Sequence, residues 1–221
     1  MPYQQRKKPV PAPAARSTHG SPLHQVRIIG GQWKRTPLPV PDAEGLRPTP
    51  DRVRETVFNW LNHLLDGAWN DVSCLDLFAG TGVLGFEAAS RGADCIVMVE
   101  AEARAVRRLE ATKAKLHAEQ VAILHGDALE TIKNMAAGMG DARFDVIFLD
   151  PPYHHGWLGK ILPKCKRLLR ENGLVYAESE TSLAQEPAPE WLVDWEIIRA
   201  DKAGMVFYYL LRCKSEPDFE A

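Results

Sequence analysis

The sequence predicts an α/β domain built around a mostly parallel β-sheet that is flanked by helices. From residue 71 onward, short apolar segments alternate with longer segments whose apolar residues recur at helical spacing, and this alternation is typical of βαβ units. The length of 221 residues fits one such domain with a short appendage. No apolar run approaches the roughly 18 residues that a membrane span needs, so we expect no membrane partner.

The expected elements follow one another in a regular order along the chain. Strands are predicted at residues 72–78, 95–99, 121–124, 144–149 and 173–177. Helices are predicted between them at residues 83–91, 102–118, 127–137 and 157–171. Two more strand-like segments, 195–198 and 205–211, are separated by the turn residues Ala200, Asp201 and Gly204, so the last pair is expected to be antiparallel.

A hairpin and a helix are predicted upstream of the sheet. The apolar segment that starts at Val26 reaches Gly30-Gly31, which can adopt the positive φ of a tight turn. Gln-Trp-Lys-Arg then returns as the second strand, and the prolines between residues 37 and 41 end it. Asp51 is positioned to cap a helix that ends at Gly67. The side of this helix opposite its apolar residues carries Arg52, Arg54 and Glu55.

Charge is divided unequally along the chain. Residues 1–41 contain seven Lys or Arg and no Asp or Glu, which leaves 20 basic against 29 acidic residues in the rest. A basic arm on an acidic body is typical of a chain whose N-terminus meets a polyanion, although a solvated basic tail explains residues 1–22 equally well. We expect a disordered basic tail at 1–22, an N-terminal extension at 23–66, a main domain at 67–214 and a short tail at 215–221.

Neither the cysteines nor the histidines are spaced as metal ligands. The four cysteines form no C-x-x-C pair, which favours reduced thiols in a cytoplasmic protein. His154 and His155 are adjacent, so their side chains point in different directions, and no Cys or Glu partner is nearby. We therefore expect exposed loop histidines and no metal.

A glycine-rich segment lies where the first predicted strand of the main domain gives way to a helix. Asp76-Leu-Phe78-Ala-Gly80-Thr-Gly82 contains two glycines that let the backbone turn sharply and approach a ligand. The following helix N-terminus presents free N–H groups. The spacing of the glycines also fits nicotinamide-dependent dehydrogenases, so on its own it indicates a nucleotide-like ligand and no particular chemistry.

Two further carboxylates stand at the ends of predicted strands. Glu100 ends the second strand, where an acidic side chain in this type of fold reaches ribose hydroxyls. Asp127 follows the third strand, and two interpretations remain open for it. It accepts a hydrogen bond from an adenine amino group, or it is only the N-cap of the next helix.

The segment after the fourth strand carries the most specific chemistry. An aromatic amine such as guanine N2 is a poor nucleophile, because its lone pair is delocalised into the ring. Acceptors on its hydrogens, the Asp150 carboxylate and the Pro151 carbonyl, would favour the pyramidal geometry in which the lone pair attacks. Pro151 and Pro152 restrict φ and remove N–H donors, and Tyr153 offers a flat face on which an extruded base can stack.

These motifs together resemble those of the class I, Rossmann-like S-adenosylmethionine-dependent methyltransferases that act on amino nitrogens. More narrowly, residues 26–211 resemble the RsmD family of bacterial 16S rRNA guanine-N2 methyltransferases. The family-specific part lies upstream, where Arg27-Ile-Ile-Gly-Gly31 is followed by Leu46-Arg-Pro-Thr-Pro-Asp-Arg-Val-Arg-Glu-Thr-Val-Phe58. A generic methyltransferase has no reason to carry this segment.

The resemblance implies a seven-stranded sheet, S-adenosylmethionine as cofactor, and small-subunit ribosomal RNA or the assembling 30S particle as the partner of a monomer. It implies cofactor contacts at Asp76, Phe78, Gly80, Gly82, Glu100 and Asp127. It implies catalysis at Asp150, Pro151, Pro152 and Tyr153. It implies RNA contacts at Arg27, Lys34, Arg52 and Arg54.

The chain departs from the family pattern at two places. Lys34-Arg35-Thr36-Pro37 stands where the family commonly has a glycine and further basic residues, which puts the individual RNA contacts there in doubt. Glu102 stands where the family often has Asp.

Other functions account for fewer of these features. A nicotinamide dehydrogenase would use the glycine loop but has no need of Asp-Pro-Pro-Tyr. A DNA adenine-N6 methyltransferase is the main alternative, and it usually carries a target-recognition insertion for which this chain has no room. A glutamine-N5 methyltransferase more typically has Asn in place of Asp150. A non-enzymatic RNA-binding protein would leave the acidic residues unexplained.

Overall fold

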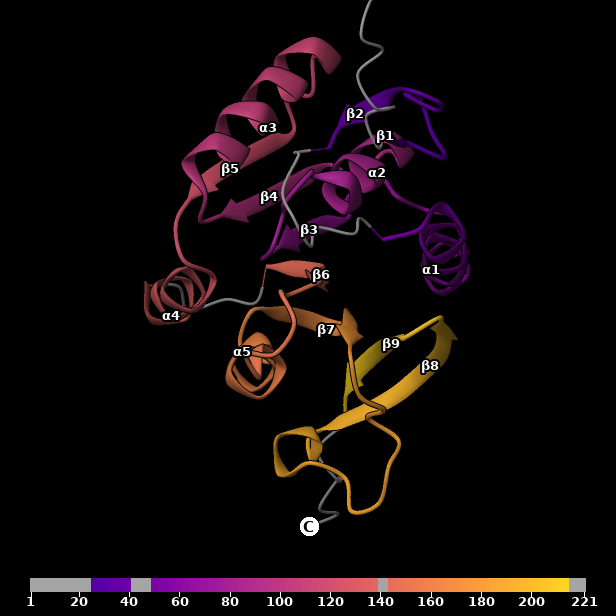
Figure 1. Cartoon of the computed structure of the whole chain (residues 1–221), viewed down its shortest axis with the longest axis vertical. Helices are drawn as coiled ribbons and strands as arrows, with labels where there is room; N and C mark the ends of the chain where they lie inside the picture. The colour runs from indigo at the N-terminus through magenta and orange to yellow at the C-terminus, as the bar shows by residue number, and fades with distance from the viewer. Residues whose placement is uncertain (1–24, 41–48, 139–142, 215–221) are drawn as a thin grey trace, which may run out of the picture.

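The computed structural model of the chain describes residues 25–40, 49–138 and 143–214 (Figure 1). The predicted basic tail at 1–22, the predicted tail at 215–221 and residues 46–48 of the upstream signature lie outside these ranges. Within the described ranges the chain forms one seven-stranded sheet and one two-stranded sheet. The expected number of strands in the main sheet is therefore confirmed.

The main sheet has the strand order β5-β4-β3-β6-β7-β9-β8. Its strands are β3 (Ser73–Asp76), β4 (Cys95–Glu100), β5 (Val121–His125), β6 (Phe144–Leu149), β7 (Leu169–Ser179), β8 (Trp195–Ala203) and β9 (Val206–Cys213). Neighbours from β5 to β7 are parallel, whereas β9 runs antiparallel to both β7 and β8. The predicted mostly parallel sheet with an antiparallel last pair is confirmed.

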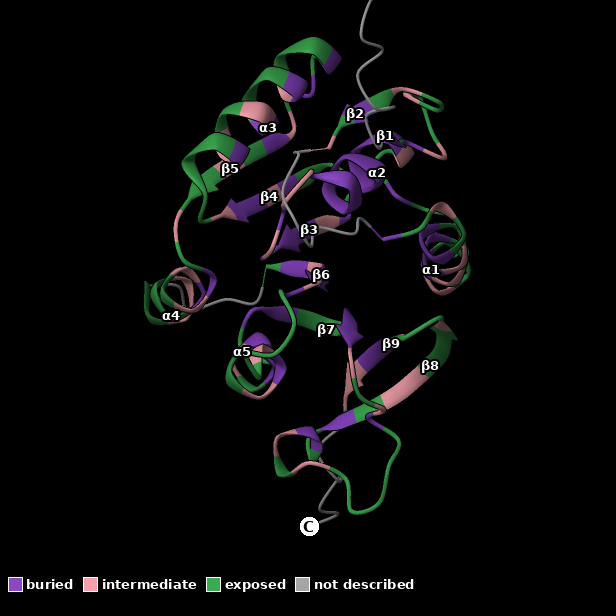
Figure 2. Ribbon diagram, viewed as in Figure 1, coloured by how far each residue is buried: buried purple, intermediate pink, exposed green. Residues whose placement is uncertain are grey.

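Side chains that alternate along the strands divide the core into two layers. On β6, Val146 and Phe148 face one layer, and Ile147 and Leu149 face the other. The first layer is covered by α1 (Asp51–Leu64), α2 (Val83–Arg91) and α3 (Ala103–Leu116), and the second by α4 (Ala128–Gly138) and α5 (Trp157–Cys165). In Figure 2, most of β6 and of α2 has the colour of buried residues. A short 3-10 helix, Glu190–Leu192, joins β7 to β8.

The helix predicted at 157–171 is shorter than expected. It ends at Cys165, and β7 already begins at Leu169. The reason is pairing with β6, because Leu169 lies opposite Phe144, and the N–H of Phe144 donates to the carbonyl of Leu168 at 3.0 Å. The long-range strand contact overrides the local helical periodicity.

The N-terminal hairpin forms with a different second strand. β1 (Gln25–Arg27) pairs with β2 (Pro37–Pro39), so the prolines expected to end the hairpin belong to it, and Gln32–Arg35 are turns. Proline is tolerated here because both strands of a two-stranded sheet are edge strands. A residue whose backbone nitrogen faces the outer edge does not have to donate a hydrogen bond to a neighbouring strand. The hairpin loop lies on α2, where the N–H of Gln32 donates to the Ser90 carbonyl at 2.7 Å. Gly31, at φ +71°, has no room for a Cβ, which would overlap that carbonyl group.

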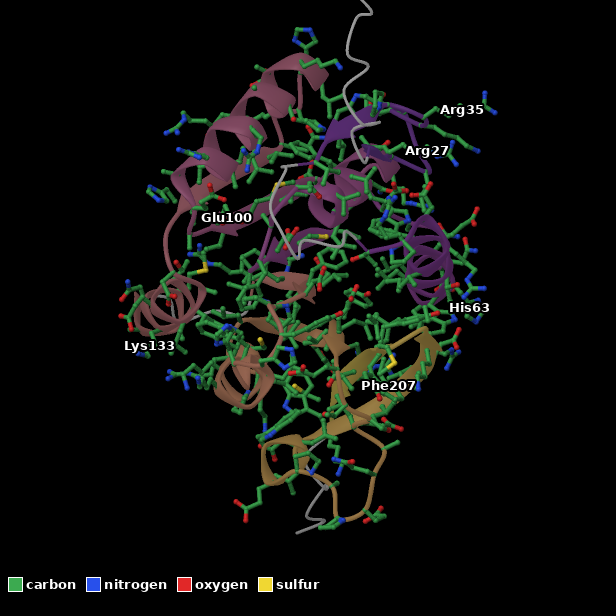
Figure 3. The ribbon with its side chains drawn as sticks, viewed as in Figure 1. Arg27, Arg35, His63, Glu100, Lys133 and Phe207 are labelled. Atoms are coloured by element: carbon green, nitrogen blue, oxygen red, sulfur yellow. The ribbon has the colours of Figure 1, made fainter. Side chains whose placement is uncertain are left out.

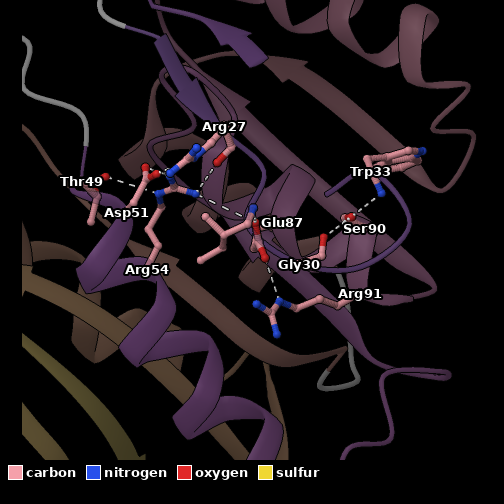
Figure 4. Close-up of polar contacts among 10 residues, drawn as sticks. Arg27, Gly30, Trp33, Thr49, Asp51, Arg54, Glu87, Ser90 and Arg91 are labelled. Atoms are coloured by element: carbon pink, nitrogen blue, oxygen red, sulfur yellow. Dashed lines mark hydrogen bonds and ion pairs between the residues drawn. The ribbon is translucent and has the colours of Figure 1, made fainter. Parts of the chain in front are cut away.

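The start of α1 differs from the prediction in two ways. Pro50 occupies the N-cap position and no side chain caps the helix. The Asp51 carboxylate instead accepts from Arg54 at 2.6 Å and from the exposed Arg27 at 2.9 Å. Arg54 does not lie on the exposed face of α1, because its side chain is 0% exposed. Its guanidinium donates to the carbonyls of Arg27 at 2.9 Å and Thr49 at 3.3 Å (Figure 4).

A buried carboxylate on α2 connects this helix to the N-terminal extension. Glu87 is fully buried and lies 3.9 Å from the Arg54 guanidinium. It also accepts from the N–H of Ile29 at 2.7 Å and from Arg91 at 2.8 Å. Burial lowers the pKa of Arg54, and the charges of Asp51 and Glu87 oppose this shift. Two buried opposite charges thus stabilise each other while each also binds backbone groups.

Removing one member of this buried pair should destabilise the whole fold. We expect Arg54→Met to lower the free energy of unfolding by about 3 to 5 kcal/mol, because Glu87 would keep only Arg91 as a charged partner and the Arg27 and Thr49 carbonyls would lose their buried donor. Arg54→Met combined with Glu87→Met should cost less than the sum of the single changes. Urea denaturation followed by circular dichroism measures both.

The matched control is Arg27→Met, since the ion pair of Arg27 with Asp51 is exposed by 63% and 40% at its two side chains. We expect it to change stability by less than about 1 kcal/mol. If Arg54→Met cost no more than Arg27→Met, the buried pair would not be what holds the extension on α2.

Candidate active site

The order of strands changes direction between β3 and β6, which are adjacent and parallel. The chain builds β3, β4 and β5 outward on one side and β6 and β7 on the other. In sheets of this kind ligands bind outside the carboxyl ends of the strands at such a switch point. Asp76 is the last residue of β3, and Asp150 directly follows β6, so the switch point brings these two predicted site residues to the same edge.

Asp76 is buried beneath the glycine loop. Its side chain is 1% exposed, and it accepts from the N–H of Phe78 at 3.4 Å. Burial raises the pKa of Asp76 to about 7, and the N–H groups of Phe78 and Gly85 act in the opposite direction. Near neutral pH this carboxyl is therefore half protonated, and it lies below the loop that a ligand would touch.

The glycine loop has the shape that the sequence predicted. Gly82, at φ +75°, precedes α2, and a Cβ there would lie 2.5 Å from Leu109. Gly80 is also left-handed, at φ +52°, but a Cβ there would meet nothing nearer than the Phe78 carbonyl oxygen at 3.9 Å. Gly82 is thus required by packing inside the protein, whereas Gly80 presents bare backbone toward open space.

Glu100 is the last residue of β4 and is labelled in Figure 3. One carboxylate oxygen accepts from the N–H of Gly80 at 2.8 Å, and the other accepts from the N–H of Glu102 at 2.8 Å. Each carboxylate oxygen has a second lone pair that remains for another donor. Glu100 therefore holds the glycine loop in place and can bind a pair of hydroxyl groups at the same time.

Asp127 acts as an N-cap, which is one of its two predicted roles. One carboxylate oxygen accepts from the N–H groups of Leu129 at 2.9 Å and Glu130 at 3.0 Å, at the start of α4. The side chain is exposed, and the cap uses only this one oxygen. The second oxygen remains free to accept from a ligand amine, so the two roles are compatible.

Asp150 is bound to a residue of the N-terminal extension. The half-buried Asp150 carboxyl lies 3.0 Å from the Thr49 hydroxyl, which is also 2.9 Å from the Glu178 carboxyl. Glu178 belongs to β7 and is 3% exposed. Tyr176, on the same strand, donates to the same Glu178 oxygen at 2.6 Å. Two acids, a threonine and a tyrosine therefore form one polar cluster at the switch point.

The two acids shift each other's protonation. Burial, followed by the negative charge of Glu178, raises the pKa of Asp150 well above its usual value. Burial also raises the pKa of Glu178, but the hydrogen bonds from Tyr176 and Thr49 oppose this shift. Asp150 was expected from the sequence to present a free carboxylate. The structure places it where the protonated form is favoured, because an acid that lacks a nearby cation and touches a second acid retains its proton.

Tyr153 lies at the outer edge of this cluster. Pro151 is buried and Pro152 exposed, and the Tyr153 side chain is 40% exposed, so its ring faces outward. The next residue, His154, adopts a left-handed φ of +67°, and both its N–H and its Nδ1 contact the Glu180 carboxylate, at 2.8 and 2.9 Å. Glu180 thus anchors the loop that carries Tyr153 to the end of β7.

Phe78 is half-buried between the glycine loop and α5. Its ring packs edge-on against Trp157 with centroids 5.6 Å apart. The Trp157 Nε1–H is buried and has no hydrogen-bond acceptor among the residues that the structure describes. The pair joins the first strand-to-helix loop to the segment that follows Tyr153.

The basic residues predicted to contact RNA divide into two groups. Arg27, Lys34 and Arg52 are exposed, and Figure 3 shows Arg27 and Arg35 along the outer side of the extension. Arg54 was grouped with them, and that placement is wrong, because its guanidinium is fully buried by Asp51, Glu87 and backbone carbonyls and cannot reach a phosphate.

Thr49, Tyr176 and Glu178 were not identified from the sequence as site residues. Thr49 lies inside the upstream signature, which was interpreted through its arginines. The fifth strand was predicted to stop at Ala177, whereas β7 continues to Ser179 and carries Glu178 into the site. An acidic residue at the end of a buried strand was the available signal.

The described part of the chain contains no group of three or more His, Cys, Asp or Glu side chains arranged to hold a metal ion. His154 and His155 are both exposed, as expected of loop histidines. Within the same residues, no helix has the length and apolar character needed to cross a membrane.

Comparison with protein families and curated proteins gives consistent matches. A family model described as Conserved hypothetical protein 95 matches residues 26–212. The Ribosomal RNA small subunit methyltransferase D of Escherichia coli strain K12 is 36% identical over 203 residues, covering 89% of this chain and 94% of that protein. The protein of the same name from Haemophilus influenzae is 36% identical over 192 residues, covering 84% of this chain and 93% of that protein.

Solved structures agree with these matches. The Escherichia coli protein yhhF superimposes with a TM-score of 0.72 at 36% identity, covering 87% of this chain and 99% of that chain. A methylase structure from Haemophilus influenzae gives a TM-score of 0.69 at 31% identity, with coverage of 86% and 99%. Because these similarities extend over most of both lengths, the chain belongs to the RsmD family, whose curated members are named ribosomal RNA small subunit methyltransferase D.

Proposed function

We propose that this protein transfers the methyl group of S-adenosylmethionine to the exocyclic N2 of a guanine in 16S ribosomal RNA. The observation that carries the proposal is the position of Asp150-Pro151-Pro152-Tyr153 beside the glycine loop at the switch point of the sheet. The curated relatives are named as methyltransferases of small-subunit ribosomal RNA. The guanine N2 atom follows from the resemblance to the RsmD family.

The residues around the glycine loop fit the cofactor. Gly80 leaves open space where a side chain would otherwise project, and Glu100 and Asp127 each retain acceptor capacity after their internal hydrogen bonds. We assign Glu100 to the ribose hydroxyls, Asp127 to the adenine amine, and Asp76, Phe78 and Gly82 to shaping the loop. When bound, S-adenosylmethionine supplies an electrophilic methyl group on a sulfonium.

Asp150 and the Pro151 carbonyl act on the target amine. An acceptor on an amine hydrogen favours the pyramidal nitrogen whose lone pair attacks the methyl carbon. Asp150 can do this with whichever carboxyl oxygen faces the open side, since Thr49 occupies only Oδ2. Because one face of the site is the rigid end of a parallel sheet, the amine and the methyl group can be held in line.

Tyr153 supports the base itself. A guanine within a folded RNA must leave its stack to reach a half-buried carboxyl, and an exposed aromatic ring replaces part of the lost stacking. Tyr153 is exposed and lies three residues from Asp150, so a base stacked on its ring has its edge close to the acceptor. Burial raises the pKa of the Tyr153 hydroxyl, which therefore stays protonated near neutral pH.

The N-terminal extension, residues 23–66, contributes contacts to RNA, and residues 67–214 form the methyltransferase domain. Arg27, Lys34 and Arg52 are exposed cations on the extension and neutralise phosphates. The substrate is 16S RNA, free or in the assembling 30S particle, and the enzyme acts as a monomer in the cytoplasm. The predicted basic tail at 1–22 adds charge to the same end of the chain.

Asp150→Asn tests the catalytic assignment directly. We expect turnover on 16S RNA to fall about 100-fold or more, because the amide cannot exchange a proton and can turn its NH2 toward the amine. Cofactor affinity should be nearly unchanged. The assay transfers a radiolabelled methyl group in vitro and identifies the modified nucleoside by mass spectrometry.

The control for this change is Asp145→Asn, at the opposite end of the same strand, where Asp145 accepts from Ser73 and Arg170. It should keep wild-type turnover. RNA from a strain lacking the protein should also lose one N2-methylguanosine from its 16S RNA. Loss of N6-methyladenine from DNA instead would favour the DNA methyltransferase and contradict the proposal.

Glu100→Ala tests the cofactor site. We expect the Kd for S-adenosylmethionine to rise by the equivalent of about 1.5 to 3 kcal/mol, because a charged acceptor of two hydrogen bonds is lost. Isothermal titration calorimetry gives the value, and Glu110→Ala, an exposed change on α3, serves as the matched control. Binding of NAD in preference to S-adenosylmethionine would reject the methyltransferase assignment.

Tyr153→Phe and Tyr153→Ala separate the ring from the hydroxyl. The Phe variant should keep most of the activity, whereas the Ala variant should lose about tenfold or more, because stacking on a base requires only the ring face. Steady-state kinetics on 16S RNA measures both. Equal loss in the two variants would instead assign the role to the hydroxyl.

A further inference from the structure

The proposed function leaves one part of the polar cluster without a task. Glu178 and Tyr176 are buried behind Asp150, at 3% and 0% exposure, and neither can reach a substrate. Thr49 is 4% exposed and lies between the two acids. A buried second acid next to the acid that faces the amine is costly unless the two share a proton, because two negative charges in contact repel each other.

The hydrogens available in the cluster can be counted. Thr49 has one hydroxyl hydrogen, yet its Oγ1 lies 3.0 Å from Asp150 and 2.9 Å from Glu178, so only one of the two can receive it. Tyr176 gives its hydrogen to Glu178 at 2.6 Å. Because the Thr49 oxygen also contacts the other acid, that acid can bond it only as a donor, which requires a proton on one of the two acids. The geometry therefore holds one proton between two acids.

The donors around the pair decide where that proton lies. Glu178 is within reach of two hydroxyl donors, Tyr176 and Thr49, and both favour its carboxylate form. Asp150 has only the shared Thr49, so the proton lies on Asp150 and points toward the Thr49 oxygen. Asp76 on β3 and Tyr176 on β7 act on the pair, burial and then the pair raise the pKa of Tyr153 after β6, and none of these groups is basic.

We propose that Glu178 is the proton acceptor behind Asp150 in the methyl transfer, positioned by Thr49 and Tyr176. The proposal rests on the proposed function of this site. As the bond between the amine nitrogen and the methyl carbon forms, the bond between that carbon and sulfur breaks. The electron pair of the broken bond stays on sulfur, and the nitrogen becomes positively charged. The nitrogen then gives a proton to the open oxygen of Asp150, Asp150 passes its own proton to the Thr49 hydroxyl, and Thr49 passes its hydroxyl proton to Glu178.

The charges balance through one turnover. The pair begins with one proton and a charge of minus one, and it ends with two protons and no charge. One proton then leaves to water when the product departs, which restores the starting state. Glu178 does not touch the substrate, so it acts through Asp150 and must be ionised at the start of each cycle.

The first experiment detects the shared proton without any substrate. Infrared difference spectroscopy of the full-length wild-type protein at neutral pH should show the carbonyl stretch of a buried protonated carboxyl group. Asp150→Asn and Glu178→Gln should each remove the part of that band that Asp76 does not contribute, because a single acid with hydroxyl or amide donors around it ionises. Glu180→Gln, which changes a carboxylate that binds His154 just past the end of β7, is the matched control and should keep the band.

The second experiment uses the pH dependence of turnover. Glu178→Gln preserves size and hydrogen bonding but cannot take a proton, so kcat should fall about tenfold or more with KM for RNA unchanged. Glu178→Asp, which can take a proton, should recover part of the loss. In Tyr176→Phe the Glu178 carboxylate loses a donor and its pKa rises, so the acidic limb of kcat should move to higher pH.

Either of two results would overturn the proposal. One is a wild-type protein without a protonated carboxyl band that Asp150→Asn and Glu178→Gln both remove, and the other is a Glu178→Gln variant with the kcat and pH profile of the wild type. A merely structural Glu178 predicts the second result, because glutamine fills the same space. If the protein methylated a different base, the infrared result and the effect of Glu178→Gln on that reaction would be unchanged, so failure of the proposed function is distinguishable.

Discussion

The buried contact between Arg54 and Glu87 determines how the two parts of this chain fit together. Arg54 lies on α1 and Glu87 on α2, the helix that follows the glycine loop. The same arginine binds the Thr49 carbonyl, and the same glutamate binds the N–H of Ile29. A single pair of charges therefore positions the hairpin loop, the start of α1 and the loop helix relative to one another. Thr49 reaches Asp150 only because this arrangement places it there.

The acidic side chains at the switch point are buried or half-buried, whereas most basic side chains of the extension that the structure describes are exposed. Asp76, Asp150 and Glu178 lie at the carboxyl ends of the strands, and burial raises the pKa of each of them. Protonation reduces the negative charge that a phosphate backbone would meet close to the site. The exposed cations Arg27 and Arg52 lie on the extension, away from these acids in the interior. An acidic body can bind a polyanion in this way without a basic active site.

The sequence was sufficient to predict elements that a local pattern defines. It was not sufficient where a contact with a residue far along the chain determines the structure. The helix at 83–91 and the strand at 144–149 were predicted with the observed bounds, because glycines flank the apolar helix and Asp150-Pro151 ends the apolar strand. The end of α5, by contrast, depends on the pairing of Leu169 with Phe144, which no local pattern contains. Arg54 was misplaced for the same reason. An arginine on a helix is exposed by default, and its burial here also needs distant partners, Glu87 33 positions away and the Arg27 carbonyl.

The site residues divide along the same line, and the division explains the upstream signature. Asp76, Gly80, Glu100 and Asp150 each stand at a strand end, where a parallel sheet collects ligands, so position along the chain was enough to identify them. Thr49 and Glu178 are 129 positions apart in the sequence. Their role can be recognised only from their contact with each other and from the contact of Thr49 with Asp150. In the Thr-Pro-Asp-Arg-Val-Arg segment, Arg52 and Arg54 were interpreted as RNA contacts. Its first residue instead contacts two acids of the site, and its last arginine holds that residue in place from inside the protein. Phosphate contacts require only an exposed charge. Thr49 and Arg54 instead depend on defined contacts inside the protein, which position the active site.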